Sequence, residues 1–187
     1  MRLVRVIPLP PPQHVGVGLC KIAVGLGWSS NTQTSKHEHD LDLGALMLGK
    51  DGKLISASHF VYYKNVESPD GAVKSLGDSL AGEGEGGNET ILVNLDAVDR
   101  HVTEILFAAI MYQAGAGRSF GQIRNACIRI STAGNGKEIF KCELSEDFPA
   151  ETSLEFGRLY ARAGAWTLDP TGRGLKGGFQ EWVDAYC

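Results

Sequence analysis

The sequence predicts an all-β protein, a β-sandwich of mainly antiparallel strands with one short helix near its C-terminal end. Apolar residues alternate with smaller ones in segments such as Ile22–Trp28, which is the period of a half-buried strand. Turn residues separate such segments, and Gly134-Asn-Gly-Lys137 predicts a hairpin between 125–131 and 138–144. Many short strands joined by turns are typical of a sandwich.

The remaining elements follow from the same patterns. A polar loop is expected at 29–39, a hairpin turn at Asp51-Gly52, and a long irregular section at 68–89. The spacing at 101–112 allows a helix, but its strand-like neighbours favour a strand. Further strands are expected at 40–48, 53–58, 60–63, 90–95, 153–162 and 166–168, and a helix at 179–186.

Composition narrows the class of protein. The chain has 187 residues, 43% hydrophobic and 21% charged, as in an ordinary globular protein. A net charge of −4 without a basic stripe argues against a nucleic-acid partner. The four cysteines, Cys20, Cys127, Cys142 and Cys187, form no C-x-x-C pair and are expected to be reduced. The first three lie in apolar runs and are predicted to be core residues.

One domain is expected. The proline cluster within Pro8–Pro12 makes residues 1–14 an extended N-terminal lead-in, and residues 15–187 form the domain. The start of the chain lacks the features of a signal peptide. No run approaches the roughly 20 apolar residues of a membrane helix, so no transmembrane segment and a cytoplasmic location are expected.

The section Ser68–Glu89 is unusually acidic and rich in glycine. Between Asn65 and Asp99 there are eight acidic residues and one base, Lys74. Carboxylates this close repel one another unless solvated, protonated or neutralised by a cation. Glycines allow sharp turns, so that oxygen atoms can converge on the six to eight positions that Ca²⁺ takes. The stricter octahedral geometry of Mg²⁺ fits less well.

Asp40 and Asp42 add to this pattern. They stand two residues apart in a predicted strand, so their side chains share one face. A solvated acidic loop is the simpler alternative on composition alone, and the section does not match an EF-hand loop. His37 and His39 would also share a face and allow a transition-metal site, although a solvated loop explains them as well.

An ordered set of short motifs resembles the TerD family of tellurium-resistance and stress proteins. The resemblance runs from about Val15 through nearly the whole chain. It is carried by Gly25-Leu-Gly-Trp28, Asp40-Leu-Asp-Leu43, Tyr62-Tyr-Lys-Asn65, Ser68-Pro-Asp-Gly-Ala72, Gly77-Asp78, Gly82-Glu-Gly-Glu-Gly86 with Glu89, Phe120-Gly-Gln, Asn125-Ala, Gly157-Arg-Leu-Tyr160, Trp166 and Gly177-Gly178.

This resemblance implies a β-sandwich, Ca²⁺ bound by loops at one end, and a role in tellurite resistance and general stress response. It also implies partners among other tellurium-resistance and stress proteins. By position, the implied metal ligands are Asp40, Asp42, Asn65, Asp70, Asp78, Ser79, Glu83 and Glu89, with backbone oxygens near Gly71 and Gly84.

The sequence departs from the family pattern at informative places. Ser29 follows Trp28 where relatives carry aspartate, and Ser79 replaces an asparagine. Gly87 and Asn88 stand where carboxylates are usual. Because ligand charge is one determinant of calcium affinity, one Ca²⁺ site is expected and the second is weakened or lost.

Two classes of function follow. The first is a calcium-binding, non-enzymatic module of the stress response. The alternative is a metal-dependent enzyme acting on phosphoester or nucleotide substrates, with the cation as Lewis acid. No general base, nucleophile motif or phosphate-binding arginine cluster is recognisable in the sequence, which favours the first class.

Overall fold

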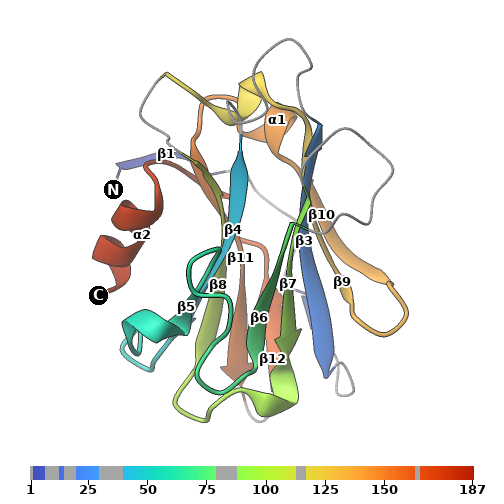
Figure 1. The fold of residues 1–187 in the computed structure, drawn as a ribbon, viewed down its shortest axis with the longest axis vertical. Helices are drawn as coiled ribbons and strands as arrows, with labels where there is room; N and C mark the ends of the chain where they lie inside the picture. Colours follow the sequence, from blue (N-terminus) through green and yellow to red (C-terminus); the bar gives the residue numbers. More distant parts are fainter. Residues whose placement is uncertain are drawn as a thin grey trace.

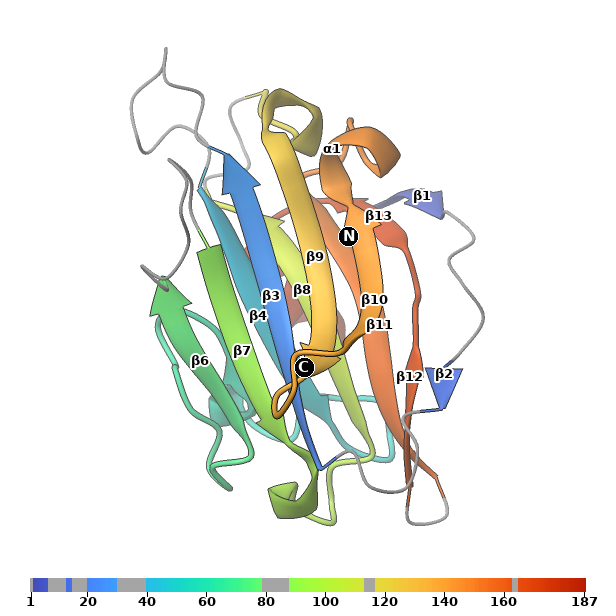
Figure 2. The ribbon, with the colours of Figure 1, turned by 90° about the vertical axis from the view of Figure 1, so that its right-hand side faces the viewer.

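The computed structural model describes residues 2–6, 13–14, 20–29, 40–78, 88–112, 117–162 and 165–187. In these ranges, two antiparallel sheets lie face to face and enclose the main core (Figure 1). The predicted all-β sandwich with a short C-terminal helix is therefore confirmed. Figure 2 shows the smaller sheet in front of the larger one.

The larger sheet, sheet A, contains β1 (Arg2–Val6), β2 (Gln13–His14), β4 (Leu41–Leu48), β5 (Phe60–Val61), β8 (Glu104–Met111), β11 (Ser153–Arg162), β12 (Ala165–Asp169) and β13 (Arg173–Lys176). Its main order is β1-β13-β11-β8-β4-β5, and β12 joins β11 to β2.

The smaller sheet, sheet B, has the order β10-β9-β3-β7-β6. These strands are β3 (Lys21–Ser29), β6 (Val73–Asp78), β7 (Asn88–Asn94), β9 (Arg124–Thr132) and β10 (Glu138–Glu143). The helices are α1 (Leu144–Asp147) and α2 (Phe179–Tyr186), and 3-10 turns η1, η2 and η3 cover Ala57–His59, Leu95–Ala97 and Phe120–Gln122. No helix within the described ranges is long and apolar enough to cross a membrane.

The main core between the sheets follows the alternation in sheet B. Ile22, Val24 and Leu26 of β3 are buried, and the residues between them are partly exposed. In β7, Ile91 and Val93 are buried in the same way. The two-residue period of these strands predicted their inward faces correctly.

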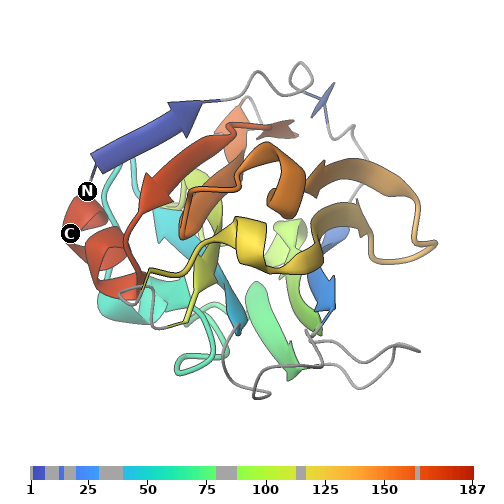
Figure 3. The ribbon, with the colours of Figure 1, turned by 90° about the horizontal axis from the view of Figure 1, so that it is seen from above.

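Sheet A is buried on both faces, which explains why β4 and β8 show no alternation. Every residue of β4 is buried, and Glu104 is the one residue of β8 that is partly exposed. The outer face of sheet A forms a second core with α2 (Figure 3). This second core contains Leu46, Leu48, Leu54, Phe60, Leu106, Ala108, Ile110, Leu175 and Trp182.

Helix α2 presents one apolar stripe to this second core. Phe179, Trp182, Val183 and Tyr186 have the i, i+3, i+4, i+7 spacing of one helix face, and all four pack against it. Trp182 is 0% exposed and its ring stacks on Tyr186. The helix therefore shields the apolar side chains on the outer face of sheet A from solvent.

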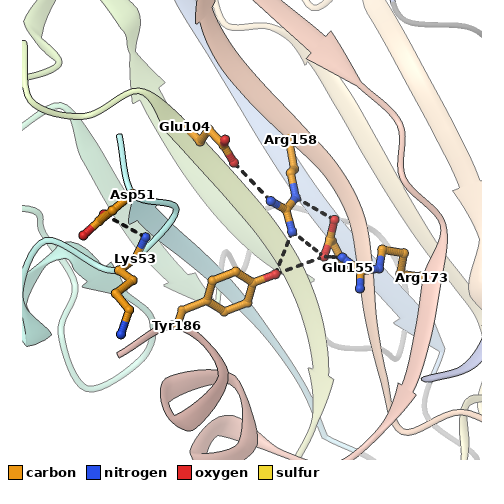
Figure 4. A network of polar contacts seen from close by, with 7 residues as sticks. All are labelled: Asp51, Lys53, Glu104, Glu155, Arg158, Arg173 and Tyr186. Carbon is orange, nitrogen blue, oxygen red and sulfur yellow. Dashed lines mark hydrogen bonds and ion pairs between the residues drawn. The ribbon is translucent and has the colours of Figure 1, made fainter. Parts of the chain in front are cut away.

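A charged network lies under the C-terminal end of α2 (Figure 4). Arg158 donates to Glu155 at 2.7 Å and 3.0 Å, to Glu104 at 3.0 Å, and to the Tyr186 hydroxyl at 2.6 Å. Arg173 also donates to Glu155, at 3.4 Å. Burial opposes the charge of Arg158, but hydrogen bonding and attraction to Glu155 outweigh it and raise the pKa of the guanidinium.

The acidic section 68–89 is not irregular throughout, which corrects the prediction. Val73–Asp78 forms β6, the edge strand of sheet B beside β7. In this strand the inward positions Val73 and Ser75 are buried, whereas Leu76 is 49% exposed. With a serine inward and a leucine outward, the hydrophobic alternation that marks a strand is lost.

The segment 53–58 does not form the expected strand. The turn at Asp51-Gly52 is confirmed, because the Gly49 amide donates to the Lys53 oxygen at 2.8 Å. Beyond it, Leu54 alone makes an isolated bridge, to Leu48. The chain then turns into η1.

The cysteines differ in burial. Cys142 is buried as expected, and its burial raises the pKa of the thiol to about 12, which keeps it protonated. Cys127 is partly buried, and Cys20 is exposed, contrary to the prediction. Cys20 precedes β3, where the chain has not yet entered the sheet. All four cysteines lie within the described residues, and they are thiols rather than disulfides.

The expected N-terminal lead-in, residues 1–14, is extended wherever it is described. Arg2–Val6 pairs with Arg173–Lys176 of β13, and Gln13–His14 pairs with Leu168 and Thr167 of β12. Both segments add strands to sheet A. The proline cluster between them lies outside the described residues.

Truncating Arg158 should strongly destabilise the fold. Arg158→Ala leaves the carboxylate of Glu155, whose side chain is 1% exposed, without its bidentate partner. Breaking a buried ion pair in this way costs about 3–5 kcal/mol. Chemical denaturation of the variant measures this loss in the free energy of unfolding.

The matched control is Lys141→Ala, which breaks the Lys141–Glu143 pair, whose side chains are both 40% exposed. A surface pair contributes about 1 kcal/mol or less. If both variants lost the same free energy of unfolding, the buried network would contribute no more to stability than the surface pair.

Candidate metal site

One end of the sandwich brings together the strands that carry most of the predicted ligands. There β3 and β6 end, and β4 and β7 begin (Figure 2). Gly27 pairs with Asn88, and Asp78 pairs with Glu89 after a shift in register that follows Ser75, so the three sheet B strands lie side by side at this end. We refer to it as the loop end.

Glu89 connects the two sheets at the loop end. Its position in the alternation of β7 turns the side chain inward, where the residue is 7% exposed. Its carboxylate Oε2 accepts a hydrogen bond of 2.5 Å from the Leu43 amide of β4 in sheet A. A carboxylate from one sheet therefore holds the start of a strand in the other.

Asp42 lies on the second residue of β4 and is 6% exposed. Because side chains alternate along a strand, it shares the outer face of sheet A with Gly44 and Leu46. Asp40 stands just before β4, and its backbone oxygen accepts from the Tyr112 amide at 2.9 Å. Both aspartates thus lie at the loop end.

Asp78 ends β6 at the same end of the sandwich, where its backbone pairs with Glu89. The predicted ligands Ser79, Glu83 and Gly84 follow it but lie outside the described residues. His37 and His39 also lie outside them. Within the described residues, no group of three or more His, Cys, Asp or Glu side chains is placed to hold a metal ion.

Asp70 and Gly71 lie at the opposite end of the sandwich. They precede β6, and Asp70 Oδ2 accepts from the Asp99 amide at 2.9 Å, beyond the far end of β7. Asp70 Oδ1 accepts from Ser68 Oγ at 2.6 Å and from the Ala72 amide at 3.0 Å. Gly71 has φ = +68°, which glycine adopts without strain. The motif thus builds a turn.

The Asp70 carboxylate is stabilised in its charged form. Partial burial alone would raise its pKa, but the hydrogen bonds from Ser68, Asp99 and Ala72 prevail and lower it. Three donors engage its two oxygens, which makes Asp70 a turn-forming residue in this structure.

Asn65 closes a short hairpin. Its backbone exchanges two hydrogen bonds of 3.0 Å with Tyr62. Its side-chain nitrogen donates to the backbone oxygens of Ser58 and Phe60, at 2.9 Å and 2.7 Å. The Asn65 amide therefore orders the segment after β5.

The loop end offers hard oxygen donors. Asp42 and Glu89 are more than nine-tenths buried, Asp42 on the outer face of sheet A and Glu89 between the sheets. Carboxylate oxygens suit Ca²⁺ or Mg²⁺ rather than Zn²⁺. Sequence reasoning missed the Leu43 amide as the partner of Glu89. A backbone donor has no side-chain signature, so no sequence signal marks it.

Fold and loop end together define a β-sandwich protein with carboxylates gathered at one end of its sheets. The TerD domain matches residues 13–186, and the chain belongs to the TerD family. It is 40% identical over 139 residues to tellurium resistance protein TerD of Serratia marcescens, covering 74% of this chain and 72% of that protein. It is 38% identical over 170 residues to general stress protein 16U of Bacillus subtilis (strain 168), covering 90% and 88%.

A solved structure agrees with the fold. The crystal structure of a homologue of telluride resistance protein (TerD) from Streptomyces coelicolor A3(2) superposes with a TM-score of 0.73. The two chains are 20% identical, and the match covers 89% of this chain and 96% of that one.

The Asp70 turn predicts a pH dependence of stability. A carboxyl whose pKa is lowered by folding stabilises the native state above its unfolded pKa, near 3.8, and loses this contribution as pH falls through the folded value. The free energy of unfolding should therefore fall below about pH 3.8, and Asp70→Asn should reduce that fall. Urea titrations from pH 7 to pH 2.5 measure it, and an unchanged slope in the variant would contradict the assignment.

Proposed function

We propose that this chain is a calcium-binding, non-enzymatic module of tellurium resistance and general stress response, acting in the cytoplasm. One observation carries the calcium part. Two residues more than nine-tenths buried, Asp42 on the outer face of sheet A and Glu89 between the sheets, lie at the same end of the strands as Asp40 and Asp78. Membership of the TerD family supports the role in resistance and stress.

The residues that would hold Ca²⁺ are those of the loop end. Asp40, Asp42, Asp78 and Glu89 would supply carboxylates, and Ser79, Glu83 and Gly84 are further candidates from the following loop. When bound, the ion would supply positive charge that favours the close approach of these oxygens. Asn65, Asp70 and Gly71 are engaged elsewhere and are not part of this proposed site.

One ion is proposed rather than two. Asn88 occupies a position at which the family pattern has a carboxylate, and it begins β7 opposite Gly27. A Cβ atom at Gly27 would lie 2.8 Å from Asn88 Oδ1, so this oxygen faces β3. A neutral amide packed against a strand supports the loss of ligand charge inferred for the second site.

The proposal is non-enzymatic because the described polar clusters serve the fold. Arg158, whose side chain is 14% exposed, is engaged by Glu155, Glu104 and Tyr186 under α2. A screen of phosphoester and nucleotide substrates with Ca²⁺, Mg²⁺ and Mn²⁺ should give no metal-dependent turnover. Turnover that is lost in Asp42→Asn would replace this proposal with an enzyme.

Ca²⁺ should raise the melting temperature of the protein. A ligand at a hundred-fold excess over its Kd stabilises the native state by about 2.7 kcal/mol. Asp42→Asn should abolish most of the shift, since it removes a ligand charge. Asp70→Asn, the same change at the opposite end of the sandwich, should retain it.

Thermal melts with millimolar Ca²⁺, with Mg²⁺ and at matched ionic strength make the measurement. An equal shift with all three salts would show a general charge effect. Equal loss in Asp42→Asn and Asp70→Asn would place the site elsewhere.

A further inference from the structure

Five aromatic rings lie together on the outer face of sheet A. Phe60 stacks on Tyr62 at 4.8 Å between ring centroids, and Tyr62 meets Tyr63 edge-on at 5.3 Å. Tyr63 contacts Tyr112 at 6.3 Å, and Phe179 completes the group. We refer to Phe60, Tyr62, Tyr63, Tyr112 and Phe179 as the aromatic cluster.

On one side, the aromatic cluster adjoins the loop end. The Tyr112 amide donates to the backbone oxygen of Asp40 at 2.9 Å. The Phe60 ring covers Gly44, where an added Cβ would lie 2.9 Å from the ring. Gly44 stands two residues after Asp42 on the same face of β4. The Phe60 ring therefore covers β4 two residues from Asp42, and the Tyr112 backbone holds that of Asp40 just before the strand.

On the other side, the aromatic cluster holds the first residue of α2. The Phe179 ring lies 5.0 Å from Tyr62, 5.5 Å from Tyr63 and 5.9 Å from Phe60. Offset and edge-on contacts of this kind are favourable aromatic geometries. Phe179 follows Gly177-Gly178, where Gly177 has φ = +152° and its amide donates to Thr152 Oγ1 at 2.9 Å.

Helix α2 has the features of an element that opens separately. It covers the second core, which is distinct from the core between the sheets. The surface beneath α2 contains the charged network of Glu155 and Arg158. A buried ion pair is by itself weak evidence that an element is stable. Within the described residues, Trp182 Nε1 and Ser153 Oγ are buried without hydrogen-bond partners, which favours opening.

We propose that cation binding at the loop end and docking of α2 are coupled through the aromatic cluster. This inference rests on the proposed calcium site. A cation that fixes Asp40 and Asp42 fixes the start of β4 and the Tyr112 backbone, and with them the rings that receive Phe179. The docked helix in turn holds these rings against β4.

The coupling acts in both directions. Packed side chains change between discrete arrangements rather than deforming continuously, so an ordered strand end favours the docked helix. Reciprocity then requires that docking of α2 raises the affinity for the cation by the same factor. Couplings between sites are typically about 5- to 150-fold.

Hydrogen exchange of the full chain, followed by mass spectrometry with and without Ca²⁺, tests the proposal. Amides of α2 should exchange about five-fold or more slowly with Ca²⁺. The β9–β10 hairpin belongs to sheet B, carries no residue of the aromatic cluster and serves as the internal reference. Isothermal titration on the same sample establishes whether Ca²⁺ binds.

Two variants separate coupling from docking alone. Phe179→Leu keeps an apolar residue on the helix but removes the ring, so it should reduce the effect of Ca²⁺ on exchange in α2 and weaken Ca²⁺ affinity. Tyr186→Phe removes the hydroxyl that Arg158 contacts at the other end of α2. This variant should speed hydrogen exchange in α2. The ratio of the exchange rates without and with Ca²⁺ should stay as in the unmodified protein.

The outcomes are distinguishable. If Ca²⁺ binds and exchange in α2 is unchanged, the coupling is wrong and the calcium site stands. If Phe179→Leu and Tyr186→Phe change the ratio equally, the aromatic cluster is not the connection. If Ca²⁺ does not bind at all, both proposals are wrong.

Discussion

The fold depends on one constraint, which is that sheet A has two apolar faces and both must be covered. Sheet B covers the inner face, and α2 packs on the outer face over the second core. The second cover is small, a helix of eight residues, and it needs the aromatic cluster and the Arg158 network to complete it. The polar Arg158 network and the apolar aromatic cluster therefore both contact α2 on the outer face.

This arrangement sets where charge can gather. Along most of β4 both faces are filled with apolar side chains, and a carboxylate is accommodated at its start, where β4 pairs with β8 but not with β5. Glu89 uses that position to connect the sheets through the Leu43 amide. A residue proposed to bind a cation thus also holds the sandwich together at the loop end.

The sequence predicted the architecture well because most strands can be recognised from an alternation of apolar and polar residues or from an apolar run between turns. It failed at β6, where Ser75 faces inward and Leu76 outward. That failure also affected the site. With 68–89 taken as one irregular section, Asp70 and Asp78 seemed able to converge, whereas the strand between them places them at opposite ends.

Other parts of the site were beyond sequence reasoning for physical reasons. The bond between Glu89 and Leu43 depends on how the sheets stack, and Asn65 and Asp70 have hydrogen-bond partners several residues or more away in the chain. Asp40 and Asp42, by contrast, lie together at the loop end because a strand fixes their spacing. Local periodicity is readable from the sequence, and contacts across layers are not.

The short pairing of β1 with β13 has a practical consequence for handling this protein. A strand with an unpaired edge presents free amides and carbonyls to other molecules, which invites association edge to edge. Arg2–Val6 occupies that edge along Arg173–Lys176. An expression tag or a shortened start that displaces these few residues would move the free edge of sheet A from β1 to β13.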